Sequence, residues 1–138
     1  MRLLFFVVLL SVVYINSAFG AIYYAQNGGT DNSCAQAVNI VTPRNSIANG
    51  ISCLSSGDTL KIRAGTYNET IGTSNLTPSK SGVSYATATT VEAYASEVVT
   101  LNSIDMYPIT SGEVKYIIFR NLRVHNAAAH GGDCVGTI

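Results

Sequence analysis

Three segments of the chain share one pattern, and this repetition constrains the possible folds more than any other feature. Each segment has a short stretch that alternates apolar and polar residues, a break near Gly65, Ala95 or Asn121, and a second short stretch rich in β-branched residues. Such stretches predict β-strands. The segments are DTLKIRAGTYNETI at 58–71, TTVEAYASEVVTL at 89–101 and KYIIFRNLRVHNA at 115–127. Because no helical pattern lies between them, we expect an all-β architecture rather than βαβ units.

The spacing of the three segments favours a solenoid. Their first strands, aligned on Thr59, Thr90 and Lys115, begin 31 and 25 residues apart. Paired short strands at this period are expected of stacked coils, because one coil cannot bury its apolar face alone. The Ser/Thr/Gly-rich insertion at 72–88 accounts for the longer interval and is expected to leave the stack as a loop. Three repeats leave a β-sandwich open as the alternative.

Alternation along the strands assigns side chains to two faces. We expect Leu60, Val91 and Ile117 to stack in one buried column. The other residues expected to point inward are Ile62, Ala93 and Phe119. Those expected to point outward are Lys61, Arg63, Glu92, Tyr94, Ile118 and Arg120, with Arg123 and His125 on the next strand. Asn121 suits a tight turn with left-handed backbone, and Gly65 is interpreted in the same way.

One helix is expected, at 43–55. Thr42 suits the N-cap and Pro43 the first helical position, while Gly57 ends the run. Its apolar stripe is Ile47, Ile51 and Leu54. Gly50 interrupts the helix at a cost of about 1 kcal/mol in propensity. We expect this helix to cover the open strand edge of the first coil.

Residues 1–20 have the features of a secretory signal peptide. Arg2 is followed by a largely apolar stretch at 3–15, and Ala18 and Gly20 place small residues three and one positions before a cut ahead of Ala21. The apolar stretch is shorter than the ~18 residues of a membrane-spanning helix. We therefore expect a secreted, extracellular domain at 21–138 that has no contact with the membrane after signal removal.

Secretion would place the three cysteines in an oxidising compartment. In an oxidising compartment Cys34 and Cys53, which enclose 20 residues counted inclusively, are expected to form a disulfide. The loop-entropy model gives such a bridge about 3 kcal/mol. Cys134 is left over, either as a buried free thiol or with a partner outside this sequence. The cysteines and histidines have no metal-ligand spacing, so no metal or cofactor is expected here.

Other single residues have structural interpretations. Asn68 and Asn75 begin glycosylation sequons, which carry glycans only if the source organism has the machinery. His125 and His130 have no nucleophile or acid at an interpretable spacing, so we interpret both as surface or turn residues. No two acidic residues lie within three positions of each other, so the spacing nominates no catalytic pair.

The charge balance excludes several partners. The chain has 8 basic and 8 acidic residues, and only 12% of its residues are charged. This gives no electrostatic reason to expect nucleic acid or an anionic membrane surface. A hydrophobic content of 47% also argues against disorder.

The motifs resemble a known family. IYYAQNGGTDNS at 22–33, GDTLKIRAGTYNETI at 57–71, VTL at 99–101 and YIIFRNLRVHNA at 116–127 are similar to the N-terminal part of secreted right-handed parallel β-helix proteins of the pectate-lyase-like superfamily. The resemblance implies a right-handed parallel β-helix with one N-terminal capping α-helix. Because residues 131–138 read as the start of another coil and bring no cap, we expect the β-helix to be truncated at its C-terminal end. Lyases, hydrolases, epimerases and adhesins share this start, so the resemblance says more about fold than about reaction.

The resemblance also implies a function. We expect the N-terminal segment of a carbohydrate-active protein, lyase- or hydrolase-like toward an acidic polysaccharide and monomeric at full length. Its catalytic coils, and any Ca²⁺ site, are expected beyond this chain. The alternative is a non-catalytic β-helix, acting as a surface, adhesive or glycan-binding module.

The candidate glycan-contact residues lie on the outward face. They are Lys61, Arg63, Tyr94 and Arg120. Basic groups beside an aromatic ring suit the carboxylates and ring faces of an acidic polysaccharide. The competing interpretation is that Arg63, Glu92 and Arg120 form solvent-exposed ion pairs from strand to strand, each worth well under ~1 kcal/mol. We favour this interpretation over a glycan site.

Overall fold

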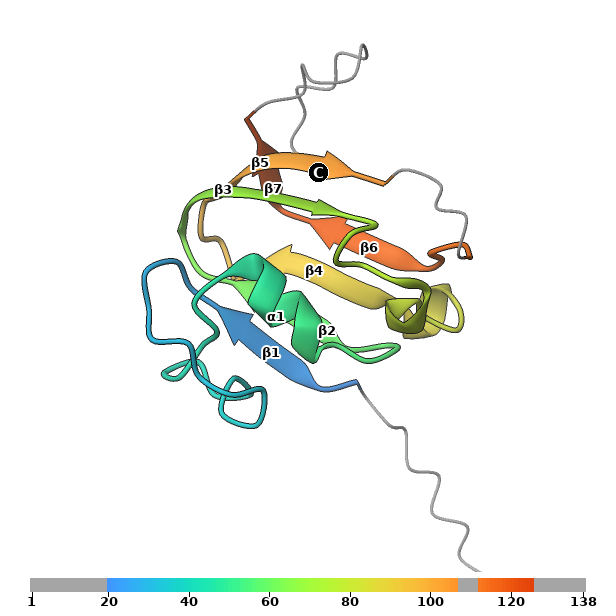
Figure 1. Ribbon diagram of the computed structural model, residues 1–138, viewed down its shortest axis with the longest axis horizontal. Helices are drawn as coiled ribbons and strands as arrows, with labels where there is room; N and C mark the ends of the chain where they lie inside the picture. Colours follow the sequence, from blue (N-terminus) through green and yellow to red (C-terminus); the bar gives the residue numbers. More distant parts are fainter. Residues whose placement is uncertain (1–19, 107–111, 126–138) are drawn as a thin grey trace, which may run out of the picture.

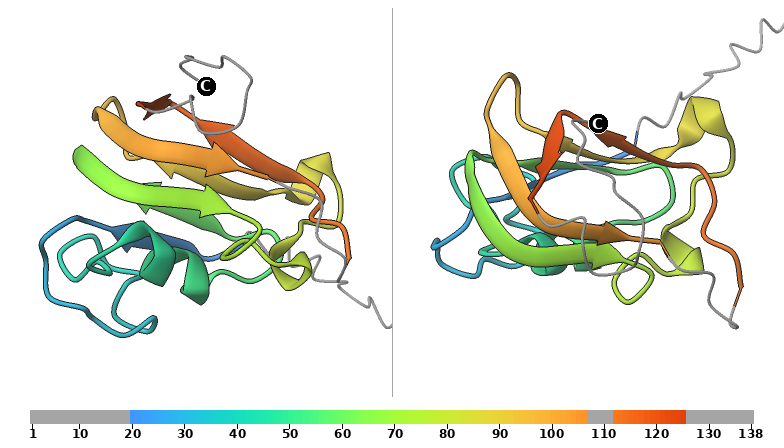
Figure 2. Two further views of the ribbon diagram at one scale, coloured as in Figure 1. Left: turned by 45° about the horizontal axis from the view of Figure 1, so that its top comes forward. Right: turned by 90° about the horizontal axis from the view of Figure 1, so that it is seen from above.

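The computed structural model describes residues 20–106 and 112–125 (Figure 1). This part of the chain is mostly β-structure with one short α-helix, and its strands form two parallel sheets stacked face to face (Figure 2). The predicted all-β class is confirmed at this level. No helix in this part of the chain is long and apolar enough to cross a membrane.

The chain alternates between the two sheets. The four-stranded sheet has the order β1 (Ile22–Ala25), β2 (Thr59–Ile62), β4 (Thr89–Ala93) and β6 (Ile117–Arg120). The three-stranded sheet has the order β3 (Gly65–Gly72), β5 (Val99–Asp105) and β7 (Leu122–Val124). Every pairing between these strands is parallel. The antiparallel sandwich is therefore excluded for the described residues, and the arrangement is of the parallel β-helix-like kind.

The corner between the two sheets contains a residue with positive φ in each repeat. Gly65, Ala95 and Asn121, which the sequence placed at the breaks, have φ angles of 156°, 51° and 56°. The left-handed values at Ala95 and Asn121 turn the chain sharply between two strands, whereas Gly65 has a different conformation that is open mainly to glycine. The left-handed turn expected at Asn121 is confirmed.

The strand register corrects one predicted contact. Leu60 pairs with Val91 as expected, but Val91 pairs with Phe119, while Ile117 pairs with Thr89. The third member of the buried column is therefore Phe119, and the expectation for Ile117 was wrong. The cause is Tyr116, whose φ of 52° keeps it out of the strand, so that β6 begins only at Ile117. Both Ile117 and Phe119 still pack against the core.

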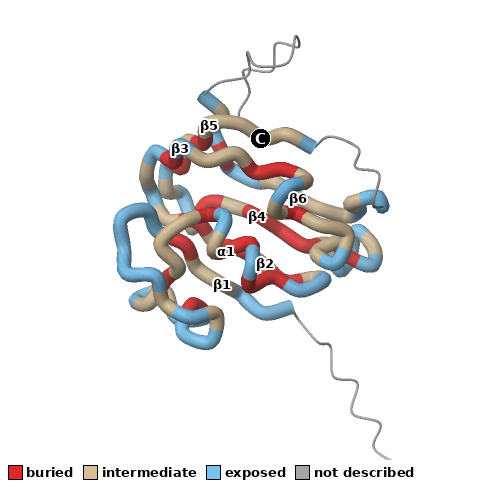
Figure 3. Tube along the Cα trace, in the orientation of Figure 1, coloured by how far each residue is buried: buried red, intermediate tan, exposed pale blue. Residues whose placement is uncertain are grey.

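The core lies between the two sheets, where Figure 3 shows the buried trace. On the second sheet Tyr67 pairs with Leu101, which pairs with Val124. The buried Tyr67 hydroxyl donates to the Arg63 carbonyl at 2.8 Å and accepts the Asn27 N–H at 3.1 Å. The largest fully buried side chains are Tyr67, Ile47, Ile51, Leu54, Leu60, Ile62, Ile71, Leu76, Leu101, Leu122, Val91 and Val99.

The helix α1 spans Ile47–Cys53 and is shorter than the predicted 43–55. Its N-cap is Ser46, so the assignments of Thr42 and Pro43 to the helix start were wrong. The reason is β1: the Arg44 N–H donates to the Tyr24 carbonyl at 2.9 Å, and this bridge takes Arg44 out of the helix, so that α1 can begin only after it. The predicted stripe of Ile47, Ile51 and Leu54 is buried, and α1 packs against β1, β2 and β3.

Two further features match the sequence analysis. Cys34 and Cys53 form a disulfide, which is typical of an oxidising compartment. The insertion contains the short 3₁₀ helices η1 (Pro78–Lys80) and η2 (Tyr85–Thr87) between β3 and β4. Residues 1–19 of the predicted signal peptide at 1–20, as well as His130 and Cys134, lie outside the described residues.

Candidate glycan-contact face

The outward face of the four-stranded sheet carries one continuous row of polar and aromatic side chains. Tyr24 pairs with Lys61, Lys61 with Glu92, and Glu92 with Arg120. Neighbouring strands lie ~4.8 Å apart, so these four residues line up across the sheet over about 14 Å. Their neighbours in sequence Leu60, Val91 and Phe119 point to the opposite, buried side.

Part of the positive charge of this row is neutralised by an ion pair between two of its own members. The Lys61 Nζ lies 3.6 Å from the Glu92 Oε1, and both side chains are half-buried. Arg120 is exposed, and within the described ranges it has no ion-pair partner. It therefore presents a guanidinium group at the edge of the row.

Arg63 lies just beyond the end of β2 and is fixed by three contacts. Its Nε is 3.0 Å from each carboxylate oxygen of Glu97, and its guanidinium carbon lies 5.3 Å from the centroid of the Tyr94 ring. The Tyr94 ring meets the Tyr24 ring edge to face at 5.9 Å. The Glu97 Oε2 also accepts the Ala64 N–H at 2.6 Å.

These contacts shift two protonation equilibria. The hydrogen bond from Arg63 lowers the pKa of Glu97, and the backbone N–H of Ala64 acts in the same direction. The hydrogen bond to Glu97 raises the pKa of Arg63. Both groups are therefore charged at neutral pH, and Arg63 contributes a fixed cation over an aromatic ring.

The structure thus places the four predicted contact residues in three different settings. Arg63 and Tyr94 touch each other, and Lys61 is tied to Glu92, whereas Arg120 is open to solvent. The alternative, ion pairs among Arg63, Glu92 and Arg120, was wrong in one member. Lys61, and not Arg63, is the partner of Glu92. Arg63 lies two residues after Lys61, beyond the end of β2, and pairs with Glu97 instead.

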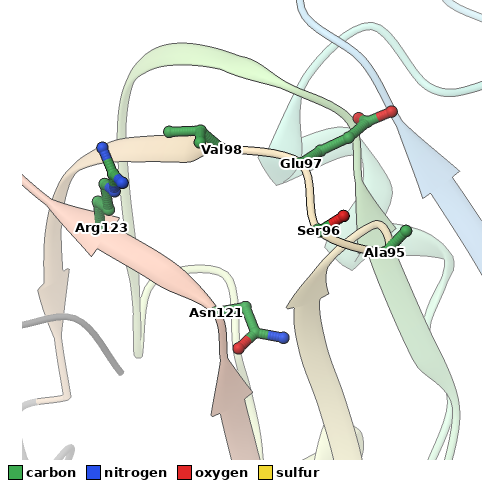
Figure 4. Close-up of a pocket in the computed structure, with 6 residues that line it drawn as sticks. All are labelled: Ala95, Ser96, Glu97, Val98, Asn121 and Arg123. Atoms are coloured by element: carbon green, nitrogen blue, oxygen red, sulfur yellow. The ribbon is translucent and has the colours of Figure 1, made fainter.

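A second feature, a pocket of about 300 Å³, was not predicted from the sequence. It lies where the corner between β4 and β5 meets the corner between β6 and β7 (Figure 4). The lining residues are Ala95, Ser96, Glu97, Val98, Asn121 and Arg123. In Figure 4 the Glu97 carboxylate points away from Arg123 and Asn121, as expected from its bond to Arg63. The only signal in the sequence was the recurrence of breaks at Ala95 and Asn121.

The remaining candidates can also be placed. His125 is exposed and its backbone N–H donates to the Leu101 carbonyl at 2.8 Å, in line with a surface position. Asn68 is exposed, while Asn75 is half-buried in a turn. Over residues 20–106 and 112–125, no three His, Cys, Asp or Glu side chains group as metal ligands.

No family model matches this chain, and no curated protein or solved structure matches it. Function is therefore inferred from the arrangement of the described side chains.

Proposed function

We propose that this chain is the N-terminal part of a secreted, carbohydrate-active protein with a right-handed parallel β-helix, and that the outward face of its four-stranded sheet binds an acidic polysaccharide. The observation that carries the proposal is the row of Tyr24, Lys61, Glu92 and Arg120, with Arg63 stacked on Tyr94 beside it. In this fold α1 covers the first coil, and further coils stack beyond β6 and β7.

The shape of the row favours an extended ligand. A strip about 14 Å long and one residue wide suits a polymer lying across the strands better than a compact metabolite. Tyr24 and Tyr94 offer aromatic surface for sugar rings, and Arg120 can donate two parallel hydrogen bonds to a carboxylate. Lys61, Arg63 and Arg120 outnumber Glu92 and Glu97 on this face, which favours an anionic sugar.

The two carboxylates of this face support a binding role more than a catalytic one. Glu92 is paired with Lys61, and Glu97 is held ionised by Arg63. The lowered pKa keeps Glu97 ionised near neutral pH, so Glu97 is unsuited to act as a general acid. In this proposal any lyase or hydrolase step belongs to coils beyond this chain, as the resemblance of the motifs implies. A purely adhesive β-helix is the second candidate, and it fits the same face.

Binding to a charged and a neutral polymer tests the proposal. The secreted chain is titrated with polygalacturonate oligomers and, in parallel, with dextran oligomers. We expect binding to polygalacturonate that weakens as salt rises, and none to dextran. Arg120→Gln should weaken binding about tenfold, since a hydrogen bond to a charged group contributes ~1.5–3 kcal/mol. Lys115→Gln, which removes a charge outside the row, is the matched control and should bind normally.

Absence of binding, or equal binding to dextran, would overturn the assignment of this face. Catalysis is tested separately by following the ultraviolet absorbance of the unsaturated product during incubation with polygalacturonate or alginate. We expect no product from this chain, with or without Ca²⁺. Product formation would place the reaction within these residues instead.

A further inference from the structure

Asp58 is a buried carboxylate that is bonded to the backbone at the start of β1. Its exposed fraction is 6%. Its Oδ1 accepts the backbone nitrogen of Ala21 at 2.7 Å, and its Oδ2 accepts the Ser55 N–H at 2.7 Å. The Ala21 carbonyl in turn accepts the Thr59 N–H at 2.8 Å. Both backbone groups of Ala21 are therefore held: its nitrogen by the Asp58 side chain, and its carbonyl by the N–H of the next residue, Thr59.

The charge of Asp58 has no cationic partner in this part of the chain. None of the ion pairs among the described residues includes Asp58. Two amide donors satisfy its oxygens but leave a buried negative charge without a compensating positive one, which is an expensive arrangement. A cation placed at the Ala21 nitrogen would complete the site.

The sequence supplies such a cation through processing. The leader pattern places the cut between Gly20 and Ala21, and the nitrogen released by that cut is the atom already bonded to Asp58. We propose that removal of the leader creates the α-ammonium of Ala21, and that this ammonium forms a buried ion pair with Asp58 which locks the first strand of the processed protein. Water adds across the Gly20–Ala21 peptide bond: Gly20 leaves with a carboxylate, and the Ala21 amine becomes protonated.

The residue before the cut also fits this interpretation. A Cβ at Gly20 would lie 1.9 Å from the Gly57 carbonyl oxygen and 2.8 Å from the Asp58 Cα. In the uncut chain, only glycine can pass this point without displacing the backbone that carries Asp58. Cleavage releases the chain from this narrow passage at the same time as it provides the charge. The processed chain is therefore expected to be more stable than a chain that continues past Ala21.

The experiment compares two secreted chains that differ only in where the ammonium lies. The first is the natural precursor, cleaved by the secretory host. The second carries Ser-Gly inserted between Gly20 and Ala21, so that the same cut leaves the ammonium two residues away and an ordinary amide at Ala21. We expect the mass of the first to begin at Ala21, and its folding equilibrium constant to exceed that of the second about tenfold, since charge-assisted hydrogen bonds are roughly twice as strong as neutral ones.

The substitution Asp58→Asn, made in both chains, shows whether the difference depends on the carboxylate. We expect the stability advantage of the natural terminus to disappear when both chains carry this substitution. If the substituted chains do not fold, ¹⁵N spectra of the unmutated pair decide. The Ala21 ammonium protons should be observable only in the chain that begins at Ala21. Equal stability of the two unmutated chains, an unprotected ammonium, or a mature terminus elsewhere would overturn the proposal.

Discussion

The carboxylate of Glu69 lies at the first turn of α1, where its Oε1 accepts the Ile47 N–H at 3.0 Å. Its Oε2 accepts the Ala48 N–H at 2.9 Å, and the Ser46 Oγ accepts the Asn49 N–H at 3.1 Å. The first three N–H groups of the helix, which have no partner within the helix itself, are thereby satisfied. Glu69 reaches this position because the pairing of β3 with β5 shifts register between Tyr67 and Thr70, and such a bulge re-aims a side chain.

Replacing Glu69 by alanine should therefore destabilise the whole domain. Two helix N–H groups would lose their acceptor, and a helix of seven residues has few other contacts of this kind. We expect the free energy of unfolding in urea to fall by about 1–2 kcal/mol. Glu113→Ala is the matched control, because Glu113 is exposed and its ion pair among the described residues is with Lys115 alone. An equal loss in the two variants would contradict the capping role.

The apolar stripe of α1 could be predicted from the sequence, whereas its start could not. Ile47, Ile51 and Leu54 recur at helical spacing, and this local pattern is enough to identify the buried face. Thr42 and Pro43 also form a good local start signal. It is overridden by Arg44, whose backbone pairs with β1, a strand far away in sequence. Glu69 lies 22 residues from Ile47, so local patterns could not reveal its capping role.

Gly50 illustrates the same difference between local and tertiary effects. By helix propensity alone, Gly50→Ala should stabilise α1 by about 1 kcal/mol. In the structure, however, a Cβ at this position would lie 2.7 Å from the Leu60 Cδ1 and 3.2 Å from the Ala25 Cβ. We expect overpacking to cost about 1–3 kcal/mol, so that thermal unfolding shows a net loss of stability instead of the gain from propensity.

Two further variants test the cause of that loss. Gly29→Ala is the control, since the atom nearest to its Cβ would be the Gln26 carbonyl oxygen at 3.6 Å, an ordinary distance. Leu60→Val added to Gly50→Ala makes room for the methyl group and should recover part of the stability. A Gly50→Ala variant as stable as the parent would show that α1 can move away from β2.

The disulfide between Cys34 and Cys53 should contribute a large share of the stability. It joins the segment after β1 to the last residue of α1, across 19 positions of sequence. On the loop-entropy model, the double variant Cys34→Ser, Cys53→Ser should lose about 3 kcal/mol. Urea unfolding of the disulfide-bonded chain with and without a reductant should show the same difference. No change on reduction would mean that the bridge does not limit the freedom of the unfolded chain, because that chain keeps residual structure without it.

The contact between Arg63 and Glu97 predicts a dependence of stability on acid. The pKa of Glu97 is lowered in the folded protein, so the pair contributes its full stability above the unfolded Glu pKa of about 4.3 and loses it as the pH falls through the folded value. Both side chains are partly exposed, so we expect a contribution below about 1 kcal/mol. Urea unfolding between neutral pH and pH 3 measures it.

Glu97→Gln isolates this contribution from other acid effects. The variant keeps a polar group near the Arg63 and Ala64 N–H donors but cannot titrate. We expect it to be less stable than the parent at neutral pH and equally stable at pH 3. A constant difference across the whole range would show that the charge of Glu97 is not what matters.

The candidate site was predictable in its residues but not in its pairings. Alternation along each strand is enough to put Lys61, Tyr94 and Arg120 on one face. Which of them touch depends on register, and register is set by contacts between distant strands. The left-handed backbone of Tyr116 shifts β6, and Phe119 consequently takes the position expected for Ile117. The turn residues Gly65 and Asn121 were identified because their chemistry is local.

The two sequons should differ in their structural roles, and the turn after β3 shows why. The Asn75 Oδ1 accepts the Gly72 N–H at 3.0 Å, and its Nδ2 donates to the Thr70 carbonyl at 3.1 Å. Asn68 is exposed, so its amide is open to solvent.

Asn75→Ala leaves two backbone groups of a half-buried turn without partners and should lower the free energy of unfolding by about 1–2 kcal/mol. Asn68→Ala should change it by less than about 0.5 kcal/mol. Both variants are compared by urea unfolding of chains made without glycosylation, so that only the side-chain contacts differ. Equal losses would show that the Asn75 hydrogen bonds do not hold this turn.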